Sequence, residues 1–423
     1  KKQLAIVRKL GLHICTGLPS GEYDVILDAI FGIGLSREIA GEFADAVNWI
    51  NEQDALRFAV DIPSGVNATT GEILAVAAAA DFTITFGTNK RGIVLFPGCN
   101  YAGTVIVSDI GFPKKAVEEI RPRAYTLTRQ DAMELMPPRI LRSNKGSYGK
   151  VLVIAGSAEI SGACYLCAAA AGRMGSGLVK VFTAAENSTV IRTRLPEALV
   201  ATYDSTLDYS QPENRLELSG RLQEEIKWAS CIVIGPGIGT KEPAGILLTE
   251  VLKEKNKAIV IDADGLNVLS GKDEYFVERE DGTRKLALSA NVVLTPHLQE
   301  MTRLTRFELP LIRARIVDQA LLALECANGQ TLVLKDARTV VTDGGEVYIN
   351  TTGNNALSTG GTGDVLTGMI AGLLAQGMRP KRAAVLAVCL HGIAADEYVR
   401  DRGGRYSMIA SDLLDMLPQI LPK

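Results

Sequence analysis

The sequence predicts an α/β protein of two three-layer domains, and two observations support this. In both halves of the chain, short apolar runs alternate with segments of helical periodicity, a pattern typical of parallel sheets covered by helices on both faces. Between the halves, residues 114–142 are charged and include the pair Pro137–Pro138, which predicts a break between structural units. We therefore expect one domain over residues 1–124 and a second over residues 125–423.

The first domain is predicted to contain four buried strands that end in polar residues or glycine. These strands are residues 23–30, 55–62, 80–86 and 104–110, and residues 42–51 are helical by their period. Asp28, Asp61, Ser64 and Lys90 fall at or just after strand ends. Because ligands of open parallel sheets bind at the carboxyl ends of strands, these side chains are expected to share a site. For any one of them alone, a strand-end cap or an exposed loop is the simpler interpretation.

The second domain is predicted to follow the same plan. Its strands are expected at residues 151–155, 178–183, 231–234, 258–261, 292–294 and 331–334. A glycine-rich turn from Gly156 to Ala163 leads into an Ala-rich helix that ends near Gly175, so the first two strands form a βαβ unit. Cys164 and Cys167 lie on one face of that helix and are predicted to be small apolar residues without a redox or metal-binding role. Residues 274–285 are charged and are expected to form a solvated loop.

A glycine-rich stretch near the C-terminal end, residues 354–368, is the strongest functional feature. Three glycines and three hydroxyl residues occupy the six positions from Ser358 to Gly363, Asp364 follows, and residues 365–374 form an apolar run at helical spacing. Glycine lets a ligand approach bare N–H groups, and the first N–H groups of a helix attract anions. A helix cap at Thr362 or Asp364 is the alternative, but the loop is longer than a cap requires. The sequence therefore predicts a phosphate site with an acid beside it.

Other residues at strand ends of the second domain leave two interpretations open. His297 is either a neutral ring held in a turn or a ligand for a polar substrate amide. Lys335 and Arg338 suit phosphate oxygens, with surface solvation as the alternative. Asp262 and Asp264 either hold Mg²⁺ through water or cap the next helix, and the cap is favoured.

Composition is that of an ordinary globular protein. The chain has 423 residues, of which 47% are apolar and 22% charged, and its net charge of −3 gives no basic field for a nucleic acid. Seven cysteines without disulfide-like spacing indicate reduced thiols and a cytoplasmic location. No apolar run is long enough for a membrane span, and no signal peptide is recognisable. The chain begins with Lys1 inside a predicted helix, so natural residues are expected to precede it.

Seven landmarks in a fixed order make the second domain resemble the NAD(P)H-hydrate dehydratases, a branch of the ribokinase-like superfamily. They are Lys145-Gly146 with Tyr148-Gly149, Gly162-Ala163, Gly235 to Gly239, Asp262 to Gly265, Thr295 to Glu300, Lys335 to Thr339 and Asn354 to Gly368. The resemblance implies a ribokinase-like fold, Asp364 as the catalytic base, and phosphorylation of a hydrated reduced nicotinamide before it loses its oxygen. The implied substrate-binding residues are Ala163, Gly237, Gly239, His297 and Asp364. The implied nucleotide-binding residues are Lys335, Asp336, Ala337, Arg338, Thr339, Asn355, Ser358, Thr359, Gly360, Gly361, Thr362 and Gly363.

The first domain resembles the NAD(P)H-hydrate epimerases, which have a Rossmann-like fold, through Asp28 to Gly34, Asp61 to Gly65 and Lys90. The resemblance implies catalysis by Asp61 and a K⁺ ion bound by Asp28 and Ser64. The implied residues for hydrate binding are Gly32, Ile33, Gly34, Leu35, Ser36, Arg37, Glu38 and Asp61. An Asn- and Gly-rich phosphate loop normally precedes these strands, and no such segment is present. The domain is therefore expected to be incomplete and to need residues before Lys1 for epimerase activity.

Taken together, the two domains resemble the bifunctional NAD(P)H-hydrate repair enzymes. The resemblance implies ADP- or ATP-dependent dehydration of the S epimer of the hydrate, with an epimerase domain that interconverts the R and S epimers. ADP is favoured because the fused architecture is typical of prokaryotes. Mg²⁺ is expected with the nucleotide, and a homo-oligomer without nucleic-acid or membrane partners is expected. A ribokinase-like kinase of a vitamin-precursor alcohol and a non-catalytic nucleotide sensor are the alternatives.

Overall fold

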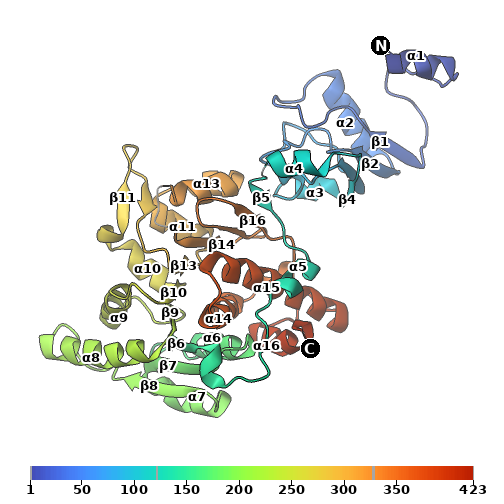
Figure 1. Ribbon diagram of the computed structural model, residues 1–423. Coiled ribbons are helices and arrows are strands. Elements are labelled where there is room, and N and C mark those ends of the chain that lie inside the picture. Colours follow the sequence, from blue (N-terminus) through green and yellow to red (C-terminus); the bar gives the residue numbers. More distant parts are fainter. Residues whose placement is uncertain (1, 121, 326–328, 423) are drawn as a thin grey trace. The chain divides into compact units, whose positions relative to one another are not determined.

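The computed structural model describes residues 2–120, 122–325 and 329–422 and divides the chain into two compact units (Figure 1). Unit 1 spans Lys1–Pro122 and unit 2 spans Arg123–Lys423. Unit 2 begins immediately before strand β5 (Ala124–Tyr125), because this strand pairs with β16 (Val347–Ile349) in the sheet of unit 2.

Unit 1 is built on a four-stranded parallel sheet in the order β1-β2-β3-β4. Its strands are β1 (Val25–Asp28), β2 (Leu56–Val60), β3 (Phe82–Phe86) and β4 (Thr104–Ser108). Its helices are α1 (Lys2–Lys9), α2 (Glu42–Glu52), α3 (Cys99–Ala102) and α4 (Lys114–Ile120), with one 3-10 turn, η1 (Arg91–Ile93). The four strands and the helix expected from the sequence are confirmed, and the strands are shorter than predicted.

The two faces of this sheet differ in burial. Val47 and Ile50 of α2 lie in a core cluster against which Ile26 packs, and on the same face of the sheet Ala59 and Thr83 are fully buried. On the opposite face, the side chain of Leu27 is 68% exposed, and α1 buries none of its residues. A sheet of this kind needs helices on both faces to bury its strands. Among the described residues of unit 1, one face of the sheet is therefore covered by α2 and the other is left partly exposed at Leu27.

Unit 2 is built on a ten-stranded sheet in the order β5-β16-β15-β14-β13-β10-β9-β6-β7-β8. Its other strands are β6 (Lys150–Ile154), β7 (Leu178–Ala184), β8 (Leu199–Tyr203), β9 (Cys231–Ile234), β10 (Ala258–Ile261), β13 (Val292–Leu294), β14 (Thr331–Leu334) and β15 (Val340–Thr342). Strand β15 is antiparallel to both of its neighbours, and the other pairings are parallel. The six strands expected from the sequence are confirmed to within one residue, whereas β5, β8, β15 and β16 were not predicted.

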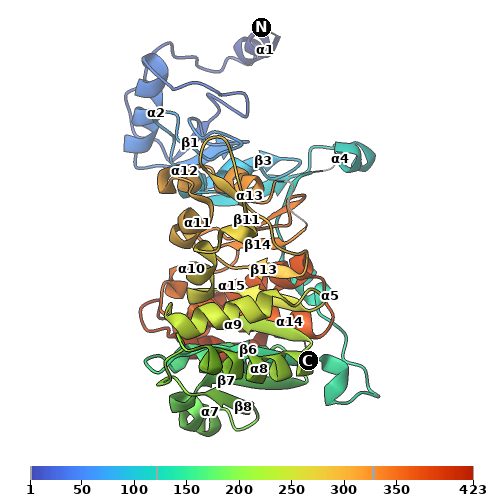
Figure 2. The same ribbon diagram turned by 90° about the vertical axis from the view of Figure 1, so that its left-hand side faces the viewer.

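Helices cover both faces of the sheet of unit 2. They are α5 (Arg129–Leu135), α6 (Gly162–Arg173), α7 (Ser188–Arg194), α8 (Pro212–Trp228), α9 (Glu242–Leu252), α10 (Asp264–Ser270), α11 (Leu298–Thr305), α12 (Leu309–Ala314), α13 (Ile316–Ala323), α14 (Thr362–Ala375), α15 (Pro380–Arg402) and α16 (Ala410–Ile420). Helix α14 packs against α6, α15 and strands β9 and β10, whereas α8 to α11 form the layer that faces the viewer in Figure 2. The result is the predicted three-layer arrangement.

Two segments expected to be irregular contain regular structure. The boundary between the units falls within residues 114–142, but in the same segment Thr128 caps α5 reciprocally with Asp131, and α5 packs on α15. The expected solvated loop contains the hairpin β11 (Phe276–Glu278) and β12 (Arg284–Leu286). Its Arg284 is only 4% exposed because its guanidinium donates to the carbonyls of Leu304 and Ser270, among others. Charge in the sequence does not reveal such burial, since the carbonyl partners lie far away in the chain.

The parallel topology brings distant segments to one edge of the sheet. Strands β14, β13, β10, β9 and β6 are consecutive neighbours. At their carboxyl ends they present, in that order, Lys335, His297, Asp262, the Gly235–Gly239 turn and the Gly156–Ala163 turn. This edge is where ligands of open parallel sheets bind.

The close contact between α14 and α6 gives a stability prediction. A Cβ atom on Gly368 would lie 2.1 Å from the Cys167 carbonyl oxygen, whereas one on the exposed helical Gly220 would meet no atom within 4 Å. We expect Gly368→Ala to lower the free energy of unfolding by about 1–3 kcal/mol through overpacking. The control, Gly220→Ala, should raise it by about 0.5–1 kcal/mol through helix propensity. Urea unfolding of both variants tests this, and equal effects would contradict the packing argument.

Candidate active site

The first turn of α14 presents a row of free backbone N–H groups. The amides of Gly360, Gly361, Gly363 and Asp364 donate to no described residue, and Gly361 adopts φ of 92° as the residue before the helix. Unpaired N–H groups at a helix start carry partial positive charge and attract anions. These amides form a cradle suited to an anion, in the stretch where the sequence predicts a phosphate site.

The threonine hydroxyls of this loop are used within the chain. Thr362 Oγ1 donates to the carbonyls of Leu357 and Thr359, both at 3.0 Å, and Thr359 Oγ1 lies within hydrogen-bond distance of the Ala356 and Met408 carbonyls. These bonds fix the shape of the loop, so that backbone amides rather than these hydroxyls face a ligand. Ser358 and Gly360 are exposed.

A buried histidine on α15 also holds the first turn of α14. His391 on α15 is 8% exposed, and its Nε2 lies 3.0 Å from the Thr362 carbonyl oxygen. Burial lowers the pKa of His391 to about 4, so the ring is neutral and donates from Nε2. No pattern in the sequence indicates this contact, because residues 362 and 391 are 29 positions apart.

Asp364 follows the cradle and has no partner. Its carboxylate forms no hydrogen bond or ion pair with the described residues. Burial, and then the nearby Asp262, raise the pKa of Asp364 to about 7, although Lys335 acts in the opposite direction. A free carboxylate with a pKa near neutrality is suited to accept a proton.

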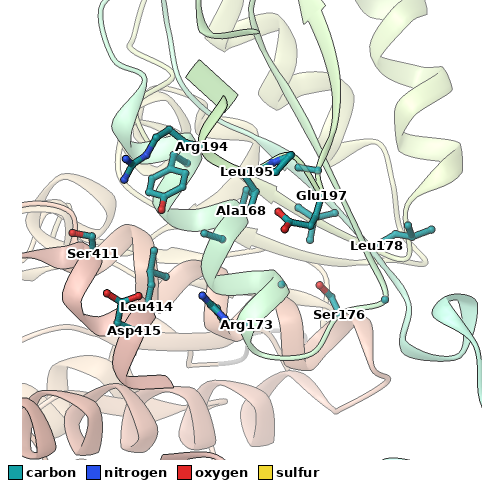
Figure 3. A pocket seen from close by; sticks show the side chains of 17 residues that line it. Ala168, Arg173, Ser176, Leu178, Arg194, Leu195, Glu197, Ser411, Leu414 and Asp415 are labelled. Carbon is teal, nitrogen blue, oxygen red and sulfur yellow. The ribbon is translucent and has the colours of Figure 1, made fainter. Parts of the chain in front are cut away.

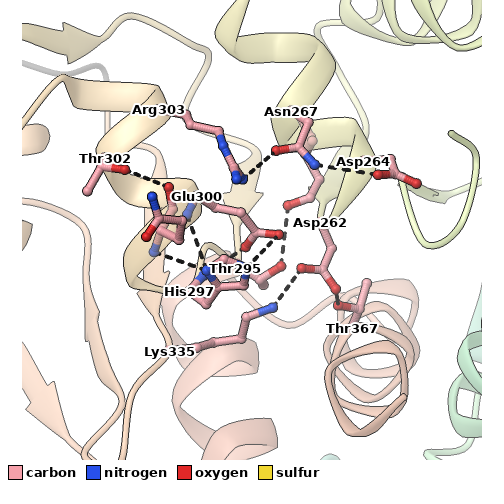
Figure 4. Close-up of polar contacts among 12 residues, drawn as sticks. Asp262, Asp264, Asn267, Thr295, His297, Glu300, Thr302, Arg303, Lys335 and Thr367 are labelled. Carbon is pink, nitrogen blue, oxygen red and sulfur yellow. Dashed lines mark hydrogen bonds and ion pairs between the residues drawn. The ribbon is translucent and has the colours of Figure 1, made fainter. Parts of the chain in front are cut away.

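Lys335 and Asp262 form a buried ion pair beside this turn (Figure 4). Lys335 Nζ lies 2.8 Å from Asp262 Oδ1, and Thr367 Oγ1 of α14 donates to Asp262 Oδ2 at 2.6 Å. Burial opposes ionisation of Asp262, but Lys335 outweighs it and keeps the pKa of this carboxyl below its usual value. A Cβ atom on Gly363 would lie 3.4 Å from Lys335 Nζ, so the ammonium lies at the mouth of the cradle.

His297 begins α11 as its cap. Its Nδ1 accepts from the amides of Gln299 and Glu300, at 3.1 and 3.2 Å, and Glu300 Oε2 accepts from the His297 amide at 2.8 Å (Figure 4). Burial and Lys335 lower the pKa of His297, so the ring is neutral with its proton on Nε2. The side chain is still 51% exposed. Both interpretations of His297 are compatible with one geometry, since Nδ1 holds the turn while Nε2, 3.4 Å from Glu300 Oε1, belongs to a half-exposed ring.

Asp264 links α10 to the glycine turn after β9. Its Oδ2 accepts from the Gly239 amide at 3.0 Å, and no side chain caps α10, which follows Ala263 at φ 48°. The favoured prediction that Asp262 or Asp264 caps this helix was therefore wrong. The caps were inferred from residue type, but one carboxylate bonds Lys335 and Thr367 and the other bonds a neighbouring loop.

The turns after β9 and β6 lie against each other. A Cβ atom on Gly237 would lie 3.1 Å from Ala163 Cβ, and one on Gly235 would lie 1.8 Å from the Asp262 carbonyl oxygen. The glycines therefore allow the two turns and the end of β10 to approach closely. Ala163 and Gly237 are brought together, while Gly239 is tied to Asp264.

The predicted nucleotide segment Lys335–Thr339 connects β14 to β15. Asp336 and Ala337 are exposed, and Thr339 Oγ1 donates to the Asp336 carbonyl at 3.3 Å. Arg338 Nη1 donates to the Thr351 carbonyl at 3.3 Å, which connects this segment to the loop that carries the exposed Asn355.

Four residues of this edge were missed or underestimated in the sequence. They are the ion-pair partner Asp262, its second donor Thr367, the buried Glu300 and His391. Burial raises the pKa of Glu300 to about 7, and Lys335 opposes that rise. The signal that could have identified Asp262 and Lys335 as partners is their place at the ends of strands in one parallel sheet.

Unit 1 has a polar cluster of its own. Asp61, at φ 70°, accepts from Lys90 Nζ at 2.6 Å, from the Phe86 amide at 3.0 Å and from Thr85 Oγ1 at 3.2 Å. Burial opposes ionisation of Asp61, but the bond from Lys90 leads the contacts that lower its pKa. Asp61 and Lys90 are thus brought together as predicted for a shared site.

Asp28 and Ser64 form the second part of this cluster. Asp28 is 2% exposed and accepts from the Ser64 amide at 2.7 Å and from Ser64 Oγ at 2.6 Å. No Lys, Arg or His among the described residues pairs with it. In the loop Gly32–Glu38 that follows β1, all residues except Leu35 are exposed.

A cavity of about 650 Å³ lies elsewhere in unit 2 (Figure 3). Arg173, Arg194, Glu197 and Asp415 line it, together with residues 176–179 at the start of β7. It therefore lies at the amino ends of the strands, whereas Asp364 and Lys335 belong to the carboxyl ends. It is not part of the candidate active site.

Two searches of the described residues found nothing. No group of three or more His, Cys, Asp or Glu side chains in residues 2–120, 122–325 and 329–422 is arranged to hold a metal ion. Over the same residues, no helix is long and apolar enough to cross a membrane.

Comparison with known proteins covers most of the chain. A family model described as NAD(P)H-hydrate dehydratase matches residues 151–419, and one described as YjeF-related protein N-terminus matches residues 1–92. The bifunctional NAD(P)H-hydrate repair enzyme of Thermofilum pendens is 37% identical over 404 residues, which cover 94% of this chain and 73% of the relative. The enzyme of the same name from Moorella thermoacetica is 37% identical over 403 residues, with the same coverage.

Solved structures match unit 2. A ribokinase-like superfamily protein from Enterococcus faecalis aligns with a TM-score of 0.59 at 28% identity, over 70% of this chain and 94% of that one. The ADP/ATP-dependent NAD(P)H-hydrate dehydratase from Bacillus subtilis, co-crystallised with ATP and Mg²⁺, aligns with a TM-score of 0.58 at 29% identity, over 70% and 96%. Unit 2 therefore has a ribokinase-like fold. The chain belongs to the NAD(P)H-hydrate dehydratase family.

The raised pKa of Asp364 gives a prediction about stability. The folded pKa of about 7 exceeds the unfolded value of 3.8, so the ionised carboxylate destabilises the fold above pH 7, and this cost disappears below about pH 4. Asp364→Asn should therefore raise the free energy of unfolding at pH 8 by roughly 1–3 kcal/mol, after a discount for partial exposure. At pH 4 the gain should be small. Denaturant unfolding at both pH values measures it, with Asp415→Asn as control; a gain independent of pH would contradict the raised pKa.

Proposed function

We propose that this chain repairs hydrated reduced nicotinamide dinucleotides by ADP- or ATP-dependent dehydration of the S epimer in unit 2. One observation carries the proposal. An unpartnered carboxylate with a pKa of about 7, Asp364, immediately follows a row of free backbone N–H groups. Membership of the NAD(P)H-hydrate dehydratase family supports it.

The reaction places each of these groups in a defined step. Asp364 accepts the proton of the ring hydroxyl while the hydroxyl oxygen attacks the terminal phosphorus of the nucleotide, so the bond to the bridging oxygen breaks and AMP or ADP leaves. The free N–H groups of Gly360, Gly361 and Gly363 stabilise the transferring phosphoryl group. The lone pair of the ring nitrogen then expels phosphate, the C–O bond breaks, and loss of a ring proton restores the double bond.

Lys335 supplies positive charge at the same point. Its Nζ lies at the mouth of the cradle and is held by Asp262, which leaves it protonated beside the phosphates. The segment Lys335–Thr339, with Asn355 and residues 358–363, binds the nucleotide. A Mg²⁺ ion accompanying the nucleotide would neutralise phosphate charge. Asp264 would fit it, because this carboxylate is paired with no cation among the described residues and Asp364 is needed as the base.

The hydrated ring is held by Ala163, Gly237, Gly239 and His297. A Cβ atom on Gly239 would meet no atom within 4 Å, which leaves backbone open to the hydrated ring. His297 would turn its Nε2–H, now 3.4 Å from Glu300 Oε1, toward a carboxamide oxygen. Glu300 holds His297 in position through the reciprocal cap at the start of α11.

Unit 1 is proposed to interconvert the R and S epimers of the hydrate, with Asp61 as the catalytic group and residues 32–38 at the substrate. Asp28 and Ser64 would hold K⁺, and the buried, cation-free Asp28 fits such an ion because a buried charge requires a counter-charge. The ion would supply that charge.

The wider setting follows from the same proposal. The chain acts on NAD(P)H hydrate and an adenine nucleotide in the cytoplasm, as a homo-oligomer and without nucleic acid. The alternative of a kinase for a vitamin-precursor alcohol is less well supported, because the family model over residues 151–419 and the relatives from Thermofilum pendens and Moorella thermoacetica are named for NAD(P)H-hydrate chemistry.

Replacement of the proposed base tests the central step. Asp364→Asn should slow dehydration of NADH hydrate by roughly 10²–10⁴-fold, because the ring hydroxyl loses its proton acceptor. Nucleotide affinity should change little, since the loop amides remain. Recovery of reduced-nicotinamide absorbance measures the rate. Asp415→Asn should be unaffected, and a near-normal rate in Asp364→Asn would remove this residue from the mechanism.

Substitutions of Arg338 and Lys335 distinguish a role in nucleotide binding from a role in the stability of unit 2. Arg338→Ala should raise the KM for nucleotide more than the KM for hydrate, with little change in stability. Lys335→Ala should also raise the KM for nucleotide but destabilise unit 2 by about 3–5 kcal/mol, because Asp262 loses its buried partner. Steady-state kinetics and urea unfolding distinguish the two; equal changes in both KM values would return Arg338 to a surface role.

A further inference from the structure

We propose that a cavity beside the hydrate site receives the adenosine end of the dinucleotide and favours a dinucleotide without a 2′-phosphate. The inference rests on the proposed dehydratase function. It names the part of the substrate that lies beyond the reach of the catalytic groups, and it makes NADH hydrate the preferred substrate.

The cavity has a volume of about 700 Å³. Three segments line it: residues 157–159 after β6, Tyr203 at the end of β8 with Ser205 and residues 207–210 beyond it, and residues 238–243 from the turn after β9 to the start of α9. This volume lies in the range of roughly 300–1,000 Å³ that is usual for sites that hold small molecules. Gly239 is part of its wall. The cavity therefore adjoins the place where the hydrated ring is proposed to bind.

Sheet order gives the direction in which the substrate extends. The donor phosphates lie at Lys335 after β14, and the ring lies near the Gly235–Gly239 turn after β9. The rest of the bound dinucleotide must extend away from the donor nucleotide, toward β6, β7 and β8. From β9 to β8 there are three steps between strands, or about 14 Å at the usual spacing. A pyrophosphate with its two riboses can bridge such a span.

Two tyrosines suit this cavity to a purine. Tyr203 and Tyr209 line it and are each 4% exposed. Tyr209 donates its hydroxyl to the Asp204 carbonyl at 2.6 Å, whereas the Tyr203 hydroxyl has no hydrogen bond to any described residue. The hydroxyl of a buried tyrosine normally has a hydrogen-bond partner. The ring of Tyr203 is held by stacking on Phe182, with 5.7 Å between centroids.

The hydroxyl of Tyr203 keeps its proton. Burial, followed by Tyr209, Glu186 and Cys164, raises the pKa of Tyr203 to about 12, so the hydroxyl stays protonated and can donate.

The charges around the cavity disfavour a phosphate. The ionisable groups in its lining, apart from the tyrosines, are Glu159, Asp208, Lys241 and Glu242. Lys241, the one lysine or arginine of the lining, already pairs with Glu159 at 3.0 Å, and Glu242 pairs with Arg215. A 2′-phosphate would therefore meet an excess of carboxylates and no unpaired cation among the described lining residues.

Three substrates test the proposal: NADH hydrate, NADPH hydrate and the hydrate of reduced nicotinamide mononucleotide, which lacks the adenosine end. With the full chain, kcat/KM for NADH hydrate should exceed that for the mononucleotide hydrate by about tenfold or more. Tyr203→Ala should remove most of this difference and leave the mononucleotide rate unchanged, and Tyr203→Phe should retain the greater part of it. Equal wild-type kcat/KM for NADH hydrate and the mononucleotide hydrate would overturn the adenosine site while leaving the dehydratase function intact.

Reversing the charge of an exposed residue gives an independent test that leaves the core of the fold untouched. Glu159→Lys should raise kcat/KM for NADPH hydrate relative to NADH hydrate by roughly tenfold at low salt. Glu280→Lys on the β11–β12 hairpin, outside the cavity lining, makes the same charge change and should leave the ratio unaltered. An unchanged ratio in Glu159→Lys, or parallel losses on all three hydrates in Tyr203→Ala, would overturn the proposal. No turnover of any hydrate by the wild-type chain would instead refute the proposed function.

Discussion

The buried ion pair between Lys335 and Asp262 is the constraint on which the active edge of unit 2 depends. Asp262 is 1% exposed, and an isolated charge at such a position is strongly disfavoured. Lys335 compensates it at 2.8 Å, and Thr367 adds a hydrogen bond from α14. The pair therefore ties the ends of β10 and β14 to the helix that carries Asp364. Its geometry decides where the phosphate cradle lies relative to the sheet.

The same pair sets the protonation of its neighbours. Burial and the nearby charge of Asp262 raise the pKa of Asp364 to about 7, while Lys335 limits the rise. Lys335 also favours the neutral ring of His297 and restrains the raised pKa of Glu300. One ammonium among several carboxylates thus leaves Asp262 ionised and Asp364 poised near neutrality. This division of roles is what a site needs if one carboxylate is structural and another accepts a proton.

Close backbone approach is the second requirement of this edge. Gly235, Gly237 and Gly368 lie where a Cβ atom would meet neighbouring backbone or side chains at 1.8, 2.7 and 2.1 Å. Glycine at these positions lets the turns after β9 and β6 converge and lets α14 pack on α6. The N–H groups of the cradle stay free because the hydroxyls of Thr359 and Thr362 satisfy carbonyls inside the loop instead.

The sequence by itself determined the two α/β units, the predicted strands and the glycine-rich loop before α14. These are local features: apolar runs, glycine clusters and helical periodicity depend on neighbours in the chain. Only the tertiary structure decided that Asp262 pairs with Lys335 rather than capping α10, that His391 holds Thr362, and that Arg284 is buried. Those contacts join residues 73, 29 and 20 positions apart, and a side chain's type does not reveal which of several possible partners folding will bring to it.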